Sequence, residues 1–396
     1  MLNSTNAMTW SKVLPQIALH PANKAMILML QRNAPIHHAC LFFLLMASCT
    51  AQPGSDQSVK VASADTGPTD SYTPYTDTTG QLAEYVVNAF ADSKGILWFG
   101  TMGKGVARYD GKSLTFLSPA DGAGGDVVSS IAEDKDGNLW FAGHEGTGLC
   151  RHDGHTFTQL WEDEGSVTAD RDGNIWASKP DGIQRFVDGA FVELELPIDR
   201  RSITTYAITP GEASFAMLDS KGNQWFRSDG AGAIKYDGTS FTRFTKKDGL
   251  CSNSVNDILE DDAGNIWFIC MQAYQPKMSG DGGLCRYDGK SFTTFPKVDG
   301  LYNNDLYTLF KDMTGNIWIG ATGTGAYRFD GKEFTLFNTT DRPDINASFG
   351  LQGMTQDRDG NYWCGFSGGL FRLAASAATS AGGEQFVNVT REGPWE

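Results

Sequence analysis

Short segments of alternating apolar and polar residues recur along this chain in one fixed order. One copy begins with the run "SVNDILED" (254–261) and passes through a turn into the apolar segment "NIWFI" (265–269). After a Gly-rich gap it ends with "GLCRYDG" (283–289) and "KSFTTF" (290–295), where aromatic residues alternate with polar ones. Two-residue alternation is typical of half-buried strands, and no segment has a convincing helical period. Each copy therefore predicts four short antiparallel strands.

A tryptophan marks each copy of the repeat. The motif Asp-x-x-Gly-Asn-x-Trp, or a close variant of it, ends at seven tryptophans: Trp98, Trp140, Trp176, Trp225, Trp267, Trp318 and Trp363. Consecutive members are separated by 36 to 51 residues, a period that is typical of repeat architectures. Seven copies of a four-stranded antiparallel unit predict an all-β chain, folded as a seven-bladed β-propeller.

The motif predicts a tight turn followed by a packing residue. Asp can bond to the backbone two residues on, Gly supplies a positive φ, and we expect Asn to tolerate the next constrained position. The tryptophan fits between stacked blades, where its burial would contribute on the order of 3 kcal/mol. Segments such as "DKDGN" (134–138) resemble calcium loops but lack the long ligand series and the terminal Glu, so no metal is expected. The Asp-Gly pairs in "YDGKSF" (287–292) and its copies predict type I′ hairpin turns.

Two segments compete to close the ring. The N-terminal stretch "SYTPYTDTTGQL" (71–82) resembles "SFTTFPKVDGLY" (291–302) and lies in register with the repeat. We therefore expect it to complete the last blade, whose third strand is "GGLFRL" (368–373). The alternative is the C-terminal segment "EQFVNVT" (384–390), added outside this strand or replacing it.

The charge of the chain is unevenly distributed. The formal net charge is −15, from 32 Lys and Arg against 47 Asp and Glu. Residues 1–49 hold Lys12, Lys24 and Arg32 and no acid, so the remainder has 29 basic and 47 acidic residues, a net charge of −18. Such a surface repels phosphate backbones, which disfavours nucleic acid as a partner.

The N-terminal region predicts export. The segment "HHACLFFLLMASC" (37–49) is too short to span a membrane and has the length of a signal-peptide core. Its last four residues resemble a bacterial lipobox, with Cys49 as the lipidated residue. We expect residues 1–49 to be a signal peptide, with Met26 or Met29 as alternative starts, 50–71 a flexible tether, and 72–396 the propeller. This predicts an extracytoplasmic protein that touches a bacterial membrane only through its lipid, in the periplasm or at the cell surface; a plain secretory signal is the alternative.

The segment "KDGLCSNSVNDILEDDAGNIWF" (247–268) resembles the two-component regulator propeller repeat, which runs Asp-Gly-Leu, Ser-Asn-x-Val, Asp-x-x-Gly-x-x-Trp. The segment 298–320 is the second-best copy. In that family the repeats commonly form extracellular sensor regions of hybrid histidine kinases, often in bacteria that degrade glycans. No kinase or DNA-binding region follows here, so the resemblance implies a propeller that binds a ligand or a protein partner, in glycan sensing or as an accessory to a sensor.

The Gly-Asn-x-Trp repeats are also similar to those of streptogramin (virginiamycin B) lyases. That resemblance implies a general base and a metal-held acid near the central axis. Past Cys49 the chain has only His144, His152 and His155, and we expect His144 to lie in an exposed polar loop. We therefore predict no catalytic residues, no cofactor and no metal, with lyase activity as the alternative.

Five cysteines follow Cys49, and none of them has a metal-binding spacing such as Cys-x-x-Cys. We expect them to pack as buried small hydrophobes. Cys270 and Cys285 lie on neighbouring predicted strands and could bridge in an oxidising compartment.

Two departures from the repeat predict where a ligand binds. The fifth repeat carries the insertion "MQAYQPKMSGDGG" (271–283) with Tyr274, and the third-to-fourth connection carries "IDRRSITTY" (198–206) with Arg200 and Arg201. Loops that break a repeat are where function tends to be added. Aromatic rings stack on sugars and Arg pairs with carboxylates, so these residues, together with Tyr302 and Asn303, predict a site for a carbohydrate or a protein on a monomeric propeller.

The lipid anchor gives a direct prediction. Replacing Cys49 with Ala removes the only atom that can carry the lipid at the lipobox, so the variant should move from the membrane fraction to the soluble fraction. Fractionation of cells that express wild type and Cys49→Ala measures this, and a variant that stays with membranes would contradict the anchor.

Overall fold

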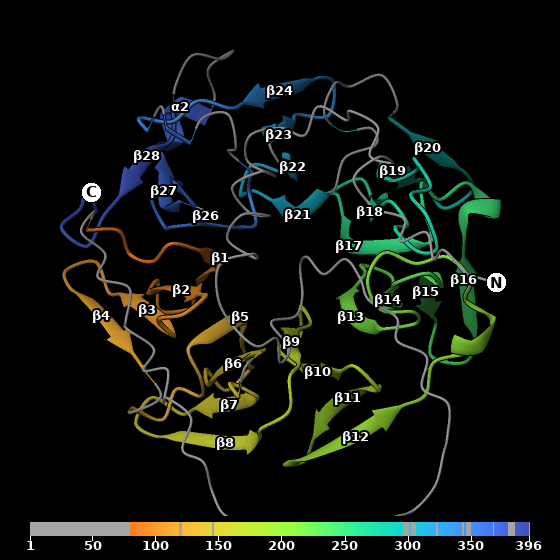
Figure 1. The fold of residues 1–396 in the computed structure, drawn as a ribbon, viewed down its shortest axis with the longest axis horizontal. Helices are drawn as coiled ribbons and strands as arrows, with labels where there is room; N and C mark the ends of the chain where they lie inside the picture. The colour runs from red at the N-terminus through yellow and green to blue at the C-terminus, as the bar shows by residue number, and fades with distance from the viewer. Residues whose placement is uncertain are drawn as a thin grey trace, which may run out of the picture.

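The protein is a ring of seven four-stranded antiparallel sheets around a central axis, which confirms the predicted seven-bladed propeller (Figure 1). The computed structural model describes residues 80–395 except 119–120, 145, 296–300, 302–305, 322–323, 343, 346–349, 367 and 379–384. Within these residues no helix combines the length and the hydrophobicity needed to cross a bilayer.

The strands follow the chain from blade to blade. Blade 1 consists of β1 (Val86–Ala91), β2 (Leu97–Thr101), β3 (Val106–Tyr109) and β4 (Leu114–Leu117), and blade 2 of β5 (Val127–Glu133), β6 (Leu139–His144), β7 (Leu149–His152) and β8 (Phe157–Trp161). Blade 3 consists of β9 (Ser166–Ala169), β10 (Ile175–Lys179), β11 (Gly182–Val187) and β12 (Ala190–Leu194). Blade 4 consists of β13 (Ala213–Leu218), β14 (Gln224–Ser228), β15 (Gly232–Tyr236) and β16 (Phe241–Phe244).

Blade 5 consists of β17 (Ser254–Glu260), β18 (Ile266–Met271), β19 (Gly283–Tyr287) and β20 (Phe292–Thr294). Blade 6 consists of β21 (Leu306–Lys311), β22 (Ile317–Ala321), β23 (Gly325–Phe329) and β24 (Phe334–Phe337). Blade 7 consists of β25 (Gly353–Gln356), β26 (Tyr362–Phe366), β27 (Gly369–Leu373) and β28 (Val387–Val389). Short helices lie between or beside the sheets: η3 (Arg200–Ser202), η4 (Lys246–Asp248) and α2 (Ala375–Ala378).

The core lies between the blades. Every residue of β18 and of β22 is buried, because both faces of these strands are covered by neighbouring sheets. One apolar cluster joins Trp267 and Ile269 of blade 5 to Leu306 and Ile319 of blade 6. Similar clusters join the other blades, so each blade is stabilised by the next one around the ring.

A single hydrogen-bonded unit explains the repeated motif. In all seven blades the indole Nε1–H of the tryptophan donates to the Asp six residues earlier, at 2.8–3.3 Å. In blade 5 the other oxygen of Asp261 accepts the N–H groups of Ala263 and Asn265. The turn and the buried Trp267 therefore share one carboxylate.

The role that we predicted for the motif Asn is wrong. Among the described residues only Asp188 has a positive φ without being Gly, so Asn265 and its equivalents do not occupy a constrained left-handed position. Instead the Asn side-chain amide donates to the same Asp carboxylate in blades 2 to 7. Gly264 alone supplies the positive φ of that turn, at 79°.

The type I′ prediction for the outer hairpins is also wrong except at one place. A type I′ turn needs a positive φ at both central residues, which only Asp188 (49°) and Gly189 (86°) provide, between β11 and β12. In the other Asp-Gly hairpins the Asp carboxylate caps a longer, four-residue loop. The N–H groups of Ser113 and then Lys112 donate to Asp110 and lower its pKa to about 2.

The C-terminal segment, and not the N-terminal one, completes blade 7. β28 pairs with β27, and Phe386 and Val389 are fully buried beside it. Of the predicted N-terminal strand, residues 71–79 lie outside the described residues, and Gln81 forms only an isolated bridge to Thr390. The C-terminal segment prevails as the fourth strand because it forms the ladder with β27 and places Phe386 and Val389 in two apolar clusters.

Trp395 strengthens the junction between the last and first blades. Its ring stacks on Tyr109 of blade 1 at 4.4 Å and on Trp363 of blade 7 at 5.8 Å. The tryptophan of blade 5 also has a stacked partner, since Trp267 stacks at 5.3 Å on Phe295, the residue that follows β20. Trp395 provides a comparable partner at the point where the ring closes.

The Asp–Trp unit predicts a specific loss of stability. Asp261→Ala leaves the N–H of the fully buried Trp267 without an acceptor, and we expect unfolding to become easier by about 1–3 kcal/mol. Asp262→Ala is the matched control. Its side chain is 70% exposed in an ion pair with Lys311, and its effect should stay within about 0.5 kcal/mol. Urea unfolding of both variants measures the difference.

The stability that Asp261→Ala loses should also depend on pH. Burial acts to raise the pKa of Asp261, but the hydrogen bonds from Trp267 and Asn265 outweigh it and lower the pKa below its ordinary value of 3.8. A depressed pKa stabilises the fold fully above that ordinary value, and the contribution is lost as the pH falls below it. The gap between wild type and Asp261→Ala should therefore shrink below pH 3.8, and an unchanged gap would contradict the assignment.

Candidate functional site

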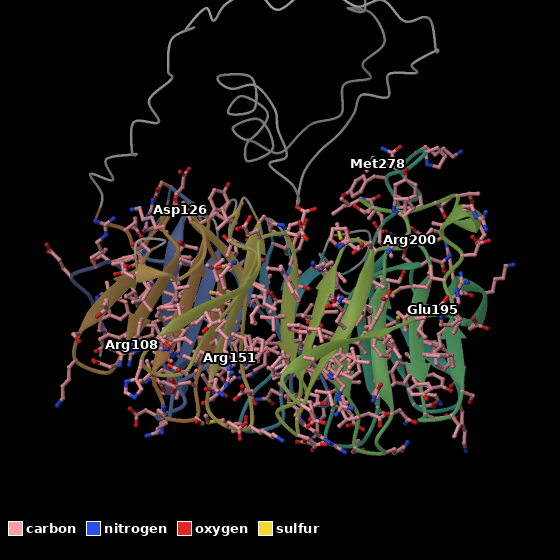
Figure 2. The ribbon with its side chains drawn as sticks, turned by 90° about the horizontal axis from the view of Figure 1, so that it is seen from below. Arg108, Asp126, Arg151, Glu195, Arg200 and Met278 are labelled. Atoms are coloured by element: carbon pink, nitrogen blue, oxygen red, sulfur yellow. The ribbon has the colours of Figure 1, made fainter. Side chains whose placement is uncertain are left out.

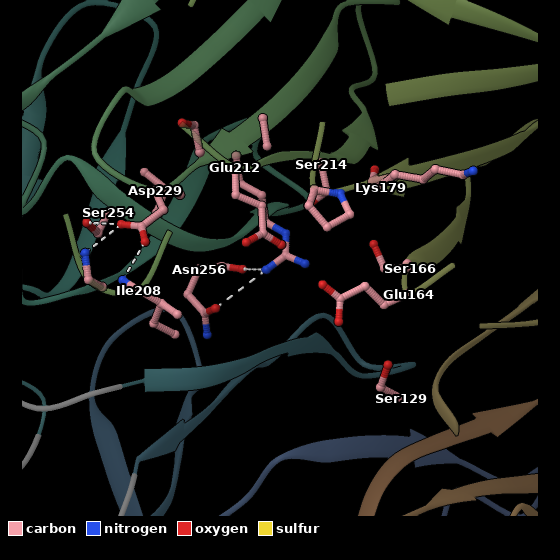
Figure 3. A pocket seen from close by; sticks show the side chains of 18 of the residues that line it. Ser129, Glu164, Ser166, Lys179, Ile208, Glu212, Ser214, Asp229, Ser254 and Asn256 are labelled. Atoms are coloured by element: carbon pink, nitrogen blue, oxygen red, sulfur yellow. Dashed lines mark hydrogen bonds between the residues drawn. The ribbon is translucent and has the colours of Figure 1, made fainter. Parts of the chain in front are cut away.

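The central channel contains a pocket on the side where blades 2 to 5 meet (Figure 3). Its volume is about 210 Å³. The walls come from the inner strands β5, β9, β13 and β17 and from the ends of the second strands β6, β10, β14 and β18. We call this the central pocket.

Bulges in the inner strands bring polar residues to the pocket wall. The pairing of β5 with β6 shifts between Val128 and Ser130, and that of β17 with β18 shifts between Val255 and Asp257. A bulge inserts one unpaired residue and redirects its side chain. The inserted residues, Ser129 and Asn256, both line the central pocket.

Seven serines line the central pocket: Ser129, Ser130, Ser166, Ser178, Ser214, Ser228 and Ser254. Some of them serve the fold, since the Ser254 hydroxyl donates to Asp229 at 2.6 Å. Ser228 is different, because it is 1% exposed and its hydroxyl has no hydrogen-bond partner among the described residues. A buried hydroxyl without a partner is costly, and this one belongs to a residue of the pocket wall.

Arg227 is the central cation of the pocket. Its guanidinium donates to the main-chain and side-chain oxygens of Asn256. Burial raises the pKa of Glu212, and the charge of Arg227 and a hydrogen bond from Thr209 oppose that rise. Burial likewise raises the pKa of Asp257 in β17, again opposed by Arg227. The charge of Arg227 therefore acts on two acidic groups in this part of the ring.

Asp229 fixes one edge of the pocket. Its carboxylate accepts the backbone N–H groups of Ala207, Ile208 and Thr209 at 2.6–2.8 Å, two of which are carried by residues that line the pocket. Because the same carboxylate also binds Ser254, it joins the third-to-fourth connection to blade 5. This edge is held by the fold before any ligand arrives.

His144 does not lie in an exposed loop, contrary to expectation. It is the last residue of β6, paired with Val127, and its side chain is 19% exposed. Its Nδ1 lies 3.4 Å from a carboxylate oxygen of Glu164, and both residues line the central pocket. The propeller fold thus brings together an imidazole and a carboxylate that are 20 residues apart in the sequence.

The two loops predicted to bind a ligand meet each other. Tyr206 and Gln275 form an antiparallel bridge, and the N–H of Tyr274 donates to the Tyr206 carbonyl at 3.0 Å. Figure 2 shows Met278 and Arg200 on the side of the ring away from Arg108 and Arg151. The insertion and the connection therefore form one rim.

The predicted arginines lie beside the central pocket and do not line it. Arg200 donates to the carbonyl of Pro180, a pocket residue, at 2.7 Å. Arg201 is 95% exposed and lies 3.5 Å from Asp199. Tyr302 and Asn303 lie outside the described residues.

Sequence reasoning missed the pocket residues, although one signal was present. Two residues after the motif tryptophan the second strand carries a small or apolar residue in most blades, such as Ala142 and Ile269. In blade 4 the same position holds Arg227, and in blade 3 it holds Ser178. An arginine in a buried strand is a departure from the repeat that points to the site.

Two segments, residues 122–145 and 249–272, match the model of the family described as two component regulator propeller. The second segment contains most of the copy that carries the resemblance, so the predicted repeat is confirmed. The copy at 298–320 is not among the matched residues, and the blade 2 copy takes its place. No curated protein sequence matches the chain.

Solved structures share the fold at low sequence identity. The extracellular domain of BT3049 from B. thetaiotaomicron, described as a hybrid two component system, is 21% identical with a TM-score of 0.57, over 75% of this chain and 40% of that one. A catalytically inactive virginiamycin B lyase from Staphylococcus aureus with quinupristin is 17% identical with a TM-score of 0.55, over 72% of this chain and 93% of the lyase.

A GH74 xyloglucanase from Xanthomonas campestris is 14% identical with a TM-score of 0.59, over 78% of this chain and 54% of that one. At these identities the likeness shows the fold alone. The chain carries two segments that match the two component regulator propeller model and shares the propeller fold with these structures, and it spans 40% of the BT3049 chain.

Glu212 gives a prediction for the site. Because burial raises its pKa above the ordinary 4.5, folding favours the protonated form, and the ionised form costs stability as the pH rises above 4.5. Glu212→Gln removes that cost, so its Tm should exceed that of wild type at pH 8 and match it at pH 4. Glu193→Gln, at an exposed position of β12, should change Tm little at either pH. A Glu212→Gln protein that is less stable than wild type at pH 8 would contradict the burial argument.

Proposed function

We propose that this propeller is a non-catalytic binding module that takes a small, hydroxyl-rich molecule, such as the end of a glycan, into the central pocket. The observation that carries the proposal is the pocket wall itself, with seven serines and the unpartnered hydroxyl of buried Ser228. In this proposal the protein is extracytoplasmic, anchored by a lipid on Cys49, and acts as a ligand-receiving accessory to a membrane sensor.

The chemistry of the wall suits a polyol. Serine hydroxyls donate and accept hydrogen bonds, and the carboxylates of Glu164 and Glu212 accept from ligand hydroxyls. Pro180 and Ile208 add apolar surface against which the C–H face of a sugar can pack. A volume of about 210 Å³ is below the roughly 300–1,000 Å³ of drug-sized pockets, which favours one sugar ring over a large ligand.

The rim extends the site in this proposal. Tyr274 offers a ring for stacking on a further sugar, and Arg200 and Arg201 offer charge for an acidic sugar or a carboxylate. Tyr302 and Asn303 belong to the same proposal, as residues of the inter-blade loops near the funnel mouth.

Glycan-array binding followed by calorimetry tests the pocket. Ser228→Ala removes a hydroxyl that serves no bond in the free protein, so we expect folding to be unchanged and the affinity for an array hit to fall about 2- to 10-fold. Ser113→Ala, at the outer turn of blade 1, is the matched control and should bind like wild type. The combined change Arg200→Ala, Arg201→Ala, Tyr274→Ala reports on the rim. If Ser228→Ala binds like wild type while remaining folded, the ligand lies elsewhere.

Lyase activity is the second candidate, favoured by the contact of His144 with Glu164 in the pocket. An imidazole paired with a carboxylate can act as a general base. Incubation of the protein with a streptogramin B and Mg²⁺, followed by mass spectrometry, detects ring opening. Turnover that disappears in His144→Ala would establish the lyase reading and overturn the non-catalytic one.

A further inference from the structure

Three cysteines that are distant in sequence converge inside blade 5. Cys251 precedes β17, Cys270 lies on β18 and Cys285 on β19. Their sulfur atoms all lie within 4.8 Å of one another, and the sulfurs of Cys251 and Cys285 are 2.9 Å apart. Among the residues that the structure describes, this is the single group of three or more Cys, His, Asp or Glu ligand atoms so close together. All three thiols are free, so the bridge between Cys270 and Cys285 that the sequence allowed is not formed.

The three sulfurs are buried in a largely apolar part of blade 5. Cys270 and Cys285 are fully buried in a cluster with Leu250 and Phe268. Cys251 is partly exposed, in the segment next to the blade 5 insertion, and its carbonyl accepts the N–H of Gly282. Cys251 is therefore the position nearest the surface, although its sulfur is buried like the other two.

Two hydrogen-bond donors are directed at one sulfur of the cluster. The backbone N–H of Cys251 donates to Cys285 Sγ at 3.4 Å, and the thiol of Cys251 points at the same atom. A thiolate is the metal-binding form of cysteine, and these donors are oriented toward it without any ligand.

We propose that Cys251, Cys270 and Cys285 form a three-sulfur binding site for a soft monovalent metal ion, Cu(I). Hard ions such as Ca²⁺ and Mg²⁺ require oxygen ligands, and structural Zn²⁺ sites are closed by four nitrogen or sulfur ligands. Thiolates select soft ions such as Cu(I). With metal–sulfur bonds of about 2.3 Å, a planar three-coordinate ion places its sulfurs about 4 Å apart, within the 4.8 Å of this cluster. Binding displaces thiol protons to solvent and moves Cys251 about 1 Å away from Cys285.

Anaerobic competition for Cu(I) tests the site. Reduced full-length protein is titrated with Cu(I) in the presence of a chromophoric Cu(I) chelator, and thiols are counted beforehand. We expect one Cu(I) per chain and an ultraviolet thiolate-to-copper absorption band. Cys251→Ser, at the least buried of the three positions, should keep the fold and weaken binding at least tenfold. Cys150→Ala, which removes a lone buried cysteine from blade 2, should bind like wild type.

Three results would overturn the proposal. The first is wild type with all thiols free that does not compete for Cu(I). The second is Cys251→Ser, shown to be folded by circular dichroism, with undiminished affinity. The third is protein isolated without reductant whose peptide map shows a Cys251–Cys285 disulfide, because the cluster would then be a cross-link and not a metal site. None of these results depends on whether the central pocket binds a glycan.

Discussion

The carboxylate–indole hydrogen bond at the turn between the first two strands of each blade is the interaction on which this fold depends. One Asp side chain closes the turn between the first two strands and accepts the N–H of the tryptophan that packs against the next blade. Local chain reversal and packing between blades are therefore linked through one pair of oxygen atoms. A change at that Asp affects two levels of structure together, which is why the same motif returns in every blade although the blade sequences otherwise differ.

Because the fold depends on a few positions of the repeat motif, the residues at other positions can vary. The turn, the tryptophan and the buried second strand are set by packing, whereas the side chains at the inner-strand bulges and at the ends of the second strands differ from blade to blade. Ser129 and Asn256 stand at bulges, and Arg227 stands where other blades have small or apolar residues. Several polar groups of the central pocket occur where the side chain differs from blade to blade, and Glu212 remains there although its burial raises its pKa.

The fold could be predicted from the sequence because its rule is local. Asp261, Gly264 and Trp267 act within seven residues, and that spacing is visible without any tertiary information. Ring closure was not predictable in this way, since both ends carry strand-like patterns and the choice depends on the burial of Phe386 and Val389. The hairpin type was missed because an Asp side chain that caps its own loop favours a longer turn than the Asp-Gly pair alone suggests.

The sites required the three-dimensional ring. The two unusual loops were predicted from the sequence to bind a ligand, and the structure joins them through Tyr206 and Gln275. The serines of the central pocket come from separate blades and look like ordinary polar strand residues when each blade is read alone. Cys251, Cys270 and Cys285 are likewise unremarkable in spacing, and they meet only because β18 and β19 are neighbours beneath the preceding connection.

The arrangement of the chain ends determines how the molecule carries a mechanical load. Residue 80 is held by the N–H of Arg391, and Gln81 is held by a backbone bridge to Thr390 and by side-chain hydrogen bonds to Asn388. A pull on the chain at this point passes into blade 7 and the Trp395 stack, on the part of the ring that does not line the central pocket (Figure 1). Tension applied to the chain before residue 80 would therefore load the junction between blades 7 and 1 before it reached blades 2 to 5, whose residues line the central pocket.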